Sequence, residues 1–373
     1  MPRGTGATGD RVNTSKRTTV GTAALAVALV GLFGMSFLPT SFVVQQPGPV
    51  YNTIGTAESA DGEEMPLIEV HDAESYETTG SLDLTTVQVL GDRERTPSWF
   101  ELAMAWFDRS KAVVPLDSVY PEGVTTEDRE EQNAALMVDS QAEATAAALT
   151  ELGYDVGGET EISVVDVTEG APATGRLEPG DIVLTADGEP IADADDLRLA
   201  IAAGDGEPVE ITYERDGEQD TTSVTPTRAS IDGEDSWAIG VLLTPMTTFD
   251  FPIDVTIQLD NVGGPSAGTM FALGIIDTLT EEDMTGGENI AGTGTIDAEG
   301  TVGAIGGIRQ KLYGARDAGA EWFLAPADNC GDVVGHVPDG LSVFSVATLS
   351  QAEDAVEAIA SGQTDDLATC ESP

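Results

Sequence analysis

A serine lies between glycines and a proline, immediately before an apolar run. The segment reads Gly263-Gly264-Pro265-Ser266-Ala267-Gly268, and the run from 270 to 276 is apolar or glycine throughout. Gly264 and Pro265 predict a turn, and the residues after Ala267 predict a helix. A serine at this junction lies where the first backbone N–H groups and the positive end of a helix dipole can stabilise a developing oxyanion. Ser266 is therefore the candidate nucleophile.

A serine nucleophile needs a base, and both histidine and lysine are rare in this chain. The only histidines are His71 and His336, and the only lysines are Lys16, Lys111 and Lys311. Lysine can act as a base when burial in an apolar site lowers its pKa toward neutrality, because desolvation penalises the ammonium form. Three and seven residues after Lys311 come Gly314 and Ala318, so small residues line its face of a helix and let another element approach closely. Lys311 is the candidate general base.

Composition excludes one class of partner and leaves room for two domains. The chain has 373 residues and a formal net charge of −50. This acidity disfavours nucleic acid and anionic lipid headgroups as partners for the bulk of the protein, because phosphate groups require positive charge. The length allows two domains with separate cores.

The N-terminus combines basic residues with a long apolar run. Residues 1–18 form a basic tail, and no charged residue occurs between Arg17 and Glu58. The run predicts a transmembrane signal anchor at 19–38, with the tail in the cytoplasm and the catalytic part outside. A cleaved signal peptide is the alternative. Residues 39–65 are predicted to be a linker.

Alternating strand and helix patterns predict an α/β (α+β) fold. Residues 82–89 and 252–259 alternate like half-buried strands, whereas 128–152 and 308–318 have helical composition. Short strand patterns dominate from 161 to 228. The segment 98–111, which follows the strand pattern at 82–89, has helical spacing and carries Trp99 and Trp106. Both tryptophans fit either core packing or a membrane interface.

The β-rich part resembles a bacterial PDZ domain. The resemblance rests on the turn at residues 177–183, Leu-x-x-Gly-Asp-x-Val, and on the Asp187-Gly188 hairpin. It implies capture of an extended or C-terminal peptide by β-augmentation. We expect the carboxylate-binding loop within 153–158, with a groove used only for packing as the alternative.

Four further segments resemble the proteolytic domain of Lon proteases: residues 264–268, 291–296, 306–312 and 318–326. The resemblance implies that Ser266 is the nucleophile and that Lys311, 45 residues later (311 − 266), is the general base. It also implies that Thr293 helps to hold the lysine, and that the turn residues Gly264, Pro265 and Ala267 support the serine.

The implied architecture is a Lon-type proteolytic domain with an inserted PDZ domain. The expected boundaries are 66–150 for the first part of the proteolytic module, 151–230 for the PDZ domain, 231–360 for the Lon-like domain and 361–373 for a C-terminal tail. The combination is similar to the membrane-anchored, ATP-independent Lon-like serine proteases of Gram-positive bacteria. It implies polypeptide substrates, no cofactor or metal, and a homo-oligomeric ring.

Two departures from the Lon pattern are visible. The sequence contains no G-x-x-x-x-G-K-[ST] motif, so no nucleotide dependence is expected. The acidic residue that many Lon enzymes place shortly before the serine is replaced by Gly263, which puts the family's loop switching in doubt.

Alternatives remain open at this stage. Gly264-x-Ser266-x-Gly268 also fits the nucleophile elbow of α/β-hydrolases, in which His336 would be the base and Asp328 its orienting acid. A non-catalytic PDZ adaptor is a second alternative. Cys330 and Cys370 would pair in an oxidising compartment, or remain two independent thiols.

Overall fold

A computed structural model describes residues 16–370, apart from 36–39, 59–63, 122, 124, 169, 216, 232–233 and 260–261. The chain divides into two compact units. Unit 1 comprises the residues up to Gly153 together with those from Ile253 onward, and unit 2 comprises Tyr154–Pro252. Unit 2 is therefore inserted into unit 1 along the chain. The expected end of the inserted domain at 230 is wrong, because the segment 241–250 pairs within unit 2.

Unit 1 contains most of the helices that the structure describes. Its helices are α1 (Lys16–Met35), α2 (Trp99–Trp106), α3 (Leu116–Val119), α4 (Thr126–Glu151), α6 (Gly268–Leu279), α7 (Ile308–Ala318), η1 (Ala327–Asn329), α8 (Cys330–Val333) and α9 (Leu349–Ala360). Its strands are β1 (Phe42–Asn52), β2 (Thr56–Glu58), β3 (Glu64–Pro66), β4 (Ile68–His71), β5 (Ser81–Leu90), β6 (Ala112–Pro115), β15 (Asp254–Ile257), β16 (Asn289–Gly292), β17 (Thr295–Ile296), β18 (Val302–Gly303), β19 (Trp322–Pro326) and β20 (Ser342–Val346).

The main sheet of unit 1 has the strand order β20-β19-β16-β5-β1-β6. The pairs β20–β19, β19–β16 and β16–β5 are parallel, whereas β1 is antiparallel to both β5 and β6. β1 lies within 39–65, so the linker prediction is wrong for this stretch. The reason is that Val43 and Val44 are buried, and an inner strand of a sheet needs such residues.

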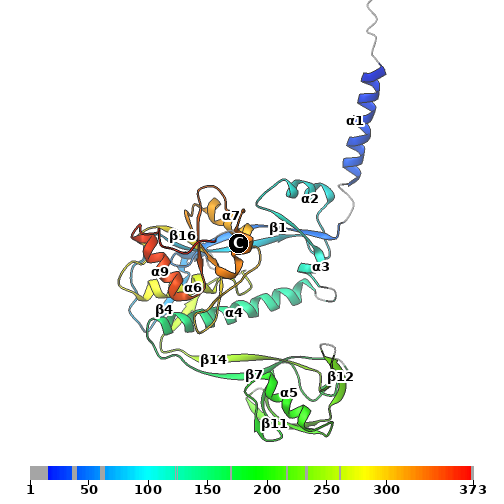
Figure 1. Ribbon diagram of the computed structural model, residues 1–373, viewed down its shortest axis with the longest axis vertical. Coiled ribbons are helices and arrows are strands. Elements are labelled where there is room, and N and C mark those ends of the chain that lie inside the picture. The colour runs from blue at the N-terminus through cyan, green and yellow to red at the C-terminus, as the bar shows by residue number, and fades with distance from the viewer. Residues whose placement is uncertain are drawn as a thin grey trace, which may run out of the picture. The chain divides into compact units, whose positions relative to one another are not determined.

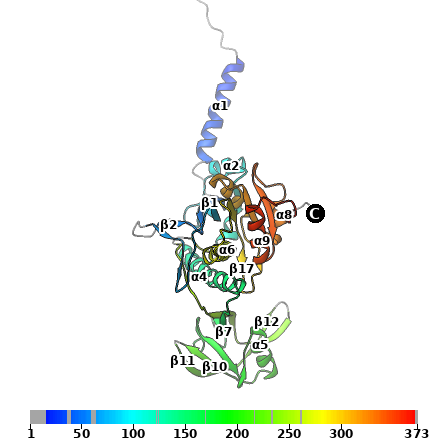
Figure 2. The ribbon, with the colours of Figure 1, turned by 90° about the vertical axis from the view of Figure 1, so that its left-hand side faces the viewer.

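Helices cover both faces of this sheet. Alternate residues of β19 point to opposite faces: Leu324 packs into the core with α4, α6 and α9, whereas Phe323 and Ala325 pack into the core with α7. Figure 2 shows α4 beside α6 and β17, in agreement with their contacts. The predicted helix 128–152 matches α4, which begins with a reciprocal capping box between Thr125 and Asp128.

Unit 2 is a β-rich domain with its own core. Its elements are β7 (Gly157–Val167), β8 (Ile182–Ala186), β9 (Glu189–Pro190), α5 (Ala194–Ala203), β10 (Val209–Arg215), β11 (Glu218–Val224), β12 (Thr227–Ile231), β13 (Glu234–Ala238) and β14 (Val241–Asp250). The sheet order is β11-β10-β8-β7-β14, and β7 with β14 forms the long antiparallel ribbon seen in Figure 1. Ile162, Val183, Leu197 and Ile211 are among the buried residues of the core.

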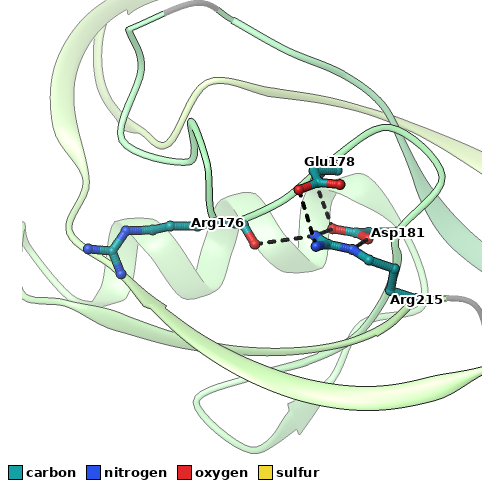
Figure 3. A network of polar contacts seen from close by, with 4 residues as sticks. All are labelled: Arg176, Glu178, Asp181 and Arg215. Carbon is teal, nitrogen blue, oxygen red and sulfur yellow. Dashed lines mark hydrogen bonds and ion pairs between the residues drawn. The ribbon is translucent and has the colours of Figure 1, made fainter.

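A buried carboxylate fixes the turn that precedes β8. The Asp181 side chain is buried and accepts hydrogen bonds from Nε of Arg215 at 2.6 Å and from the backbone N–H of Glu178 at 2.8 Å. Arg215 also pairs with the Glu178 carboxylate at 3.3 Å. The hydrogen bonds to Asp181 raise the pKa of the Arg215 guanidinium. Figure 3 shows the Arg215 guanidinium between these groups, while Arg176 contributes its carbonyl and its side chain points away. The charges at this turn are therefore structural.

The N-terminal prediction is not supported. α1 covers most of the expected span at 19–38, whereas residues 36–39 and the tail up to 15 lie outside the described residues. No helix within the described part of the chain has the length and apolar character needed to cross a membrane.

The C-terminal segment is not a free tail. Cys330 and Cys370 form a disulfide, and the N–H of Ser345 donates to the carbonyl of Ala368 at 2.8 Å. Leu367 packs against the main core of unit 1. The disulfide resolves the alternative left open by the sequence, and the segment belongs to unit 1.

Candidate functional site

The candidate nucleophile lies in a tight loop directly before α6. Gly264 has a φ of 90°, a left-handed conformation that favours glycine, and Ala267 is the N-cap of α6. Ten of the twelve residues of α6 are buried, so the helix is a rigid base for the loop. Gly268 must be glycine as well, because a Cβ there would lie 2.8 Å from Cγ2 of Ile296.

Helix α4 holds the loop from one side. The N–H of Gly264 donates to the carbonyl of Asn133 at 2.8 Å, and the Ser140 hydroxyl donates to the carbonyl of Pro265 at 3.0 Å. From the sequence we assign Ser140 no role, since no neighbour in the chain could activate its hydroxyl. The structure instead places it beneath the loop that carries Ser266. A buried serine on the apolar face of an alanine-rich helix is the signal that would have found it.

The segment after β16 holds the loop from the other side. The carbonyl of Ser266 accepts a hydrogen bond from the Thr293 hydroxyl at 2.8 Å and another from the N–H of Gly294 at 3.0 Å. Thr293 directly follows β16, so it lies at the carboxyl end of a parallel strand, where functional residues gather in such sheets. The loop is thus hydrogen-bonded on both sides of the serine.

Lys311 reaches the same point from α7 on the other face of the sheet. Its ammonium donates to Oγ of Ser266 at 2.7 Å and to Oγ1 of Thr293 at 2.8 Å. The lysine is 2% exposed, and among the described residues no carboxylate forms an ion pair with it. Burial lowers the pKa of Lys311 from its ordinary 10.5 to about 7. The three site residues predicted from separate parts of the sequence therefore meet.

Gly314, on the same face of α7 as Lys311, lies against β1. A Cβ at Gly314 would lie 3.5 Å from Cβ of Pro47, so β1 passes directly over the helix. Gly314 is buried, whereas Ala318, at the end of the same face, is exposed. The close approach expected from the sequence is real over the first two turns, and the approaching element is the stretch that we predict as a linker.

The absence of an acidic residue at position 263 has a steric explanation. An ideal Cβ at Gly263 would lie 2.7 Å from Cβ of Asn133, nearer than side-chain carbons approach one another. Helix α4 therefore excludes any side chain at 263 while the loop keeps its hydrogen bonds to α4. The departure from the Lon pattern goes together with a loop that α4 fixes in place.

The oxyanion site differs in detail from the expectation. The first N–H groups of α6 already have acceptors: those of Met270 and Phe271 donate to the carbonyl of Ala267, each at 3.0 Å, and that of Thr269 donates to Gly294 at 3.2 Å. The N–H groups of Ser266 and Ala267 have no acceptor within the described part of the chain. These two amides, rather than those of the helix itself, are the candidate oxyanion donors.

The hydrolase alternative finds no support in the geometry. Nδ1 of His336 lies 3.1 Å from the carbonyl oxygen of Val334, in its own loop. The hydrogen bonds described for the Ser266 hydroxyl lead to Lys311 and not to His336. In addition, β15 ends at Ile257, several residues before the serine, whereas a nucleophile elbow requires a strand that runs directly into the turn.

The peptide-binding features of unit 2 also differ from the expectation. Gly157 and Gly158 pair with Asp250 and Phe249 of β14, so they belong to a strand ladder and not to an open carboxylate-binding loop. β14 is an edge strand: its sole strand partner within the described residues is β7, and it contacts α5. β14 is therefore one of the two edge strands of this sheet, and β11 is the other.

Two family models match separate parts of the chain. Residues 258–359 match the Lon protease (S16) C-terminal proteolytic domain, and residues 123–225 match the PDZ domain. The first match contains Ser266, Thr293 and Lys311. The chain thus carries a Lon-type proteolytic domain and a PDZ domain, a combination that supports a serine peptidase.

Relatives of the proteolytic part are Lon proteases. The chain is 39% identical over 92 residues to Lon protease 1 of Sorangium cellulosum, covering 24% of this chain and 11% of that protein. It is 31% identical over 144 residues to the Lon protease of Phenylobacterium zucineum, covering 39% and 17%. The chain therefore spans less than a fifth of either relative. Among solved structures, the PDZ domain of the SdrC-like protein from Listeria innocua is 27% identical, with a TM-score of 0.21, covering 22% of this chain and 92% of that one.

Proposed function

We propose that this chain is a serine endopeptidase whose catalytic pair is Ser266 and Lys311. The observation that carries the proposal is the 2.7 Å contact between the Lys311 amine and the Ser266 hydroxyl at a buried site where the pKa of the lysine falls to about 7. An amine with that pKa is largely neutral at slightly alkaline pH, and its lone pair accepts a proton.

In the first half-reaction, the neutral amine of Lys311 takes the proton of the Ser266 hydroxyl while Oγ attacks the peptide carbonyl carbon. The N–H groups of Ser266 and Ala267 stabilise the resulting oxyanion. The Lys311 ammonium then gives its proton to the leaving amine nitrogen, the C–N bond breaks, and an acyl-enzyme ester remains. Thr293 orients the lysine through its 2.8 Å hydrogen bond.

In the second half-reaction, the Lys311 amine removes a proton from a water molecule, which attacks the ester carbonyl. The C–O bond to Ser266 breaks, the lysine returns the proton to Oγ, and a carboxylic acid product is released. We also propose that neither step needs a nucleotide, since the sequence lacks a phosphate-binding loop of the G-x-x-x-x-G-K-[ST] type.

The test is cleavage of an unfolded polypeptide by full-length protein, with and without added ATP. Ser266→Ala and Lys311→Arg are each expected to lower kcat by at least about a thousandfold, because an arginine cannot release its proton in the working pH range. His336→Ala serves as the control and is expected to retain full activity. Undiminished cleavage by Lys311→Arg would exclude the pair, and a loss of activity confined to His336→Ala would restore the hydrolase alternative.

Unit 2 is proposed to bind extended peptides along the free edge of β14. Its support is the unpaired outer edge of that strand among the described residues and the neighbouring α5. Titration with a labelled unstructured peptide, with a free or an amidated carboxyl terminus, measures the binding. If no peptide binds saturably, the proposal for unit 2 fails, and the non-catalytic adaptor alternative fails with it.

The catalytic unit is proposed to work outside the cytoplasm, attached to the membrane by the N-terminal segment and assembled as a homo-oligomeric ring. The disulfide between Cys330 and Cys370 supports an oxidising compartment. Support for attachment and for the ring comes from the sequence resemblance. Digestion of unit 1 by a protease added to intact cells tests the location. Sedimentation of the purified protein tests the assembly into a ring. Full protection from the protease would contradict the location.

A further inference from the structure

A pocket of about 340 Å³ lies in unit 1 beside the proposed catalytic pair. Asn133 lines it, and the carbonyl of Asn133 accepts the N–H of Gly264, two residues before Ser266, at 2.8 Å. Gly307 lines it as well, and its carbonyl accepts the N–H of Lys311 at 3.1 Å. The segments that hold the serine and the lysine in place therefore both contribute to the wall of this pocket.

Three valines form the apolar part of the lining. Val87 and Val89 are half-buried on the same face of β5, and Val119, at the end of α3, is buried. None of the three belongs to the hydrophobic cores that the described residues of unit 1 form, and none packs against them. Apolar side chains that face open space beside a few polar groups are typical of a ligand pocket, and the volume suits one large side chain.

The charged residues of the lining balance one another. Arg129 and Glu130, neighbours in α4, both line the pocket. The Arg129 guanidinium lies over the ring of Tyr120, 5.6 Å from its centre, and within the described part of the chain neither Arg129 nor Glu130 forms an ion pair. An acidic side chain in the pocket would face Glu130, and a basic one would face Arg129. The pocket therefore favours an uncharged side chain.

The wall at Gly306 is fixed and leaves room for a side chain. The N–H of Ile305 donates to Oδ1 of Asn329 at 2.8 Å, and Nδ2 of Asn329 donates to the carbonyl of Ile305 at 3.0 Å. Asn329 is buried, so these two bonds hold the residue directly before Gly306. Gly306 lines the pocket, its backbone is not left-handed, and a Cβ added there would meet no atom within 4 Å. A larger residue at 306 would therefore reduce the volume of the pocket without strain.

We propose that this pocket binds the side chain of the substrate residue whose carbonyl Ser266 attacks, and that it selects large uncharged apolar side chains such as leucine. The inference rests on the proposed peptidase function and names its substrate class. The attacked carbonyl bonds to Oγ of Ser266, so the side chain of that residue lies nearest to the loop that Asn133 holds. Apart from Gly306 and Gly307, the lining comes from residues 45–133, outside the segment 258–359 that matches the Lon domain. The selection is therefore a property of this chain.

The test is the cleavage specificity of the full-length protein. Mass spectrometry of a digested unfolded polypeptide locates the cleaved bonds, and peptides are then made that differ only in the residue before such a bond. For the wild type, kcat/KM is expected to be at least about tenfold higher with leucine at this position than with alanine, glutamate or lysine.

Two variants change the pocket in opposite directions. Gly306→Val, which narrows it, is expected to lower the ratio of kcat/KM for leucine over alanine at least about tenfold. Val89→Ala, which widens it, is expected to raise the ratio for phenylalanine over leucine about fivefold. Gly331→Val is the matched control, because a Cβ on Gly331 in α8 also meets no atom within 4 Å, and it is expected to leave both ratios unchanged.

The outcomes separate the pocket from the catalytic pair. Cleavage with the same ratios in the wild type, Gly306→Val and Val89→Ala would overturn the proposal and leave the catalytic pair standing. An equal loss for leucine and alanine peptides in Gly306→Val, with no shift in Val89→Ala, would also overturn it, because it would mean damage to the loop and not selection. A shift confined to the residue after the cleaved bond would assign the pocket to the leaving side and contradict the proposal. Absence of cleavage by the wild type would overturn the proposed function itself.

Discussion

At Lys311, burial and not a neighbouring charge sets the chemistry. The amine contacts two hydroxyls, of Ser266 and Thr293, and both hydroxyls can bond a neutral amine as readily as an ammonium. Desolvation then favours the neutral form, and this is the cause of the lowered pKa. A carboxylate at the same distance would raise the pKa and disable the base.

The activity is expected to depend on pH through this one group. Since the pKa of Lys311 in the folded protein is about 7, kcat/KM is expected to fall about tenfold per pH unit below pH 7 and to level off above it. The measurement is a pH profile of peptide cleavage. If kcat/KM already begins to fall at a pH well above 8, the pKa of Lys311 is higher than expected and the amine is solvated.

Stability is expected to follow the same group with a definite sign. Between about pH 7 and 10.5, the unfolded lysine binds more protons than the folded one, so the free energy of unfolding increases with pH in this window. Lys311→Met removes the titrating group from the same site. Denaturant unfolding of both proteins at several pH values checks that the slope is smaller in the variant.

At the scale of elements, α4 positions Ser266, the proposed nucleophile, although it supplies no reacting atom. It holds the loop through the carbonyl of Asn133 and the hydroxyl of Ser140, and it leaves no space for a side chain at Gly263. The loop that carries Ser266 is thus held between α4 and the residues after β16. Such a clamp keeps the serine oriented in the absence of substrate.

Ser140→Ala is expected to lower kcat about tenfold or more with little change in KM, because a small displacement of the nucleophile slows acylation. The matched control is Thr145→Ala, which removes another buried hydroxyl of α4 whose hydrogen bond goes to its own helix, at the carbonyl of Gln141. Each loss is expected to cost about 1 kcal/mol of stability. The rate at which Ser266 reacts with a fluorophosphonate separates the two; equal rates would deny Ser140 a positioning role.

At the scale of the whole molecule, the inserted unit leaves the proteolytic core intact. The main sheet of unit 1 combines β1 and β5, which precede the insertion, with β16, β19 and β20, which follow it. The disulfide then fastens the last described residue of the chain to the beginning of α8. Removal of this cross-link releases a segment that packs against the core.

The double variant Cys330→Ser/Cys370→Ser is expected to lose about 2–4 kcal/mol of stability, which corresponds to a Tm lower by roughly 5–10 °C. The bond closes a loop with a sequence separation of 40. Calorimetry with and without a reducing agent checks this. The reducing agent is expected to lower the Tm of the wild type and to leave that of the double variant unchanged; no change in either would mean that the bond contributes nothing.

The sequence by itself determined the local features. Glycine and proline spacing predicted the turn at Ser266, the apolar run after it predicted α6, and the helical composition of 128–152 predicted most of α4, because each depends on neighbours a few residues apart. It also singled out Lys311 by rarity and by the small residues that follow it.

Only the tertiary structure decided which distant segments meet. The sequence assigned β1 to a linker, ended the inserted unit before β14 and gave Ser140 no role. The reason is that the strands that pair with β1 and β14 lie tens of positions away in the chain, and the loop that Ser140 supports lies 125 positions away. The lowered pKa of Lys311 belongs to the same class. It exists because Lys311 is buried where α7 meets the loop before α6 and the residue after β16. Packing between elements so far apart leaves no local pattern.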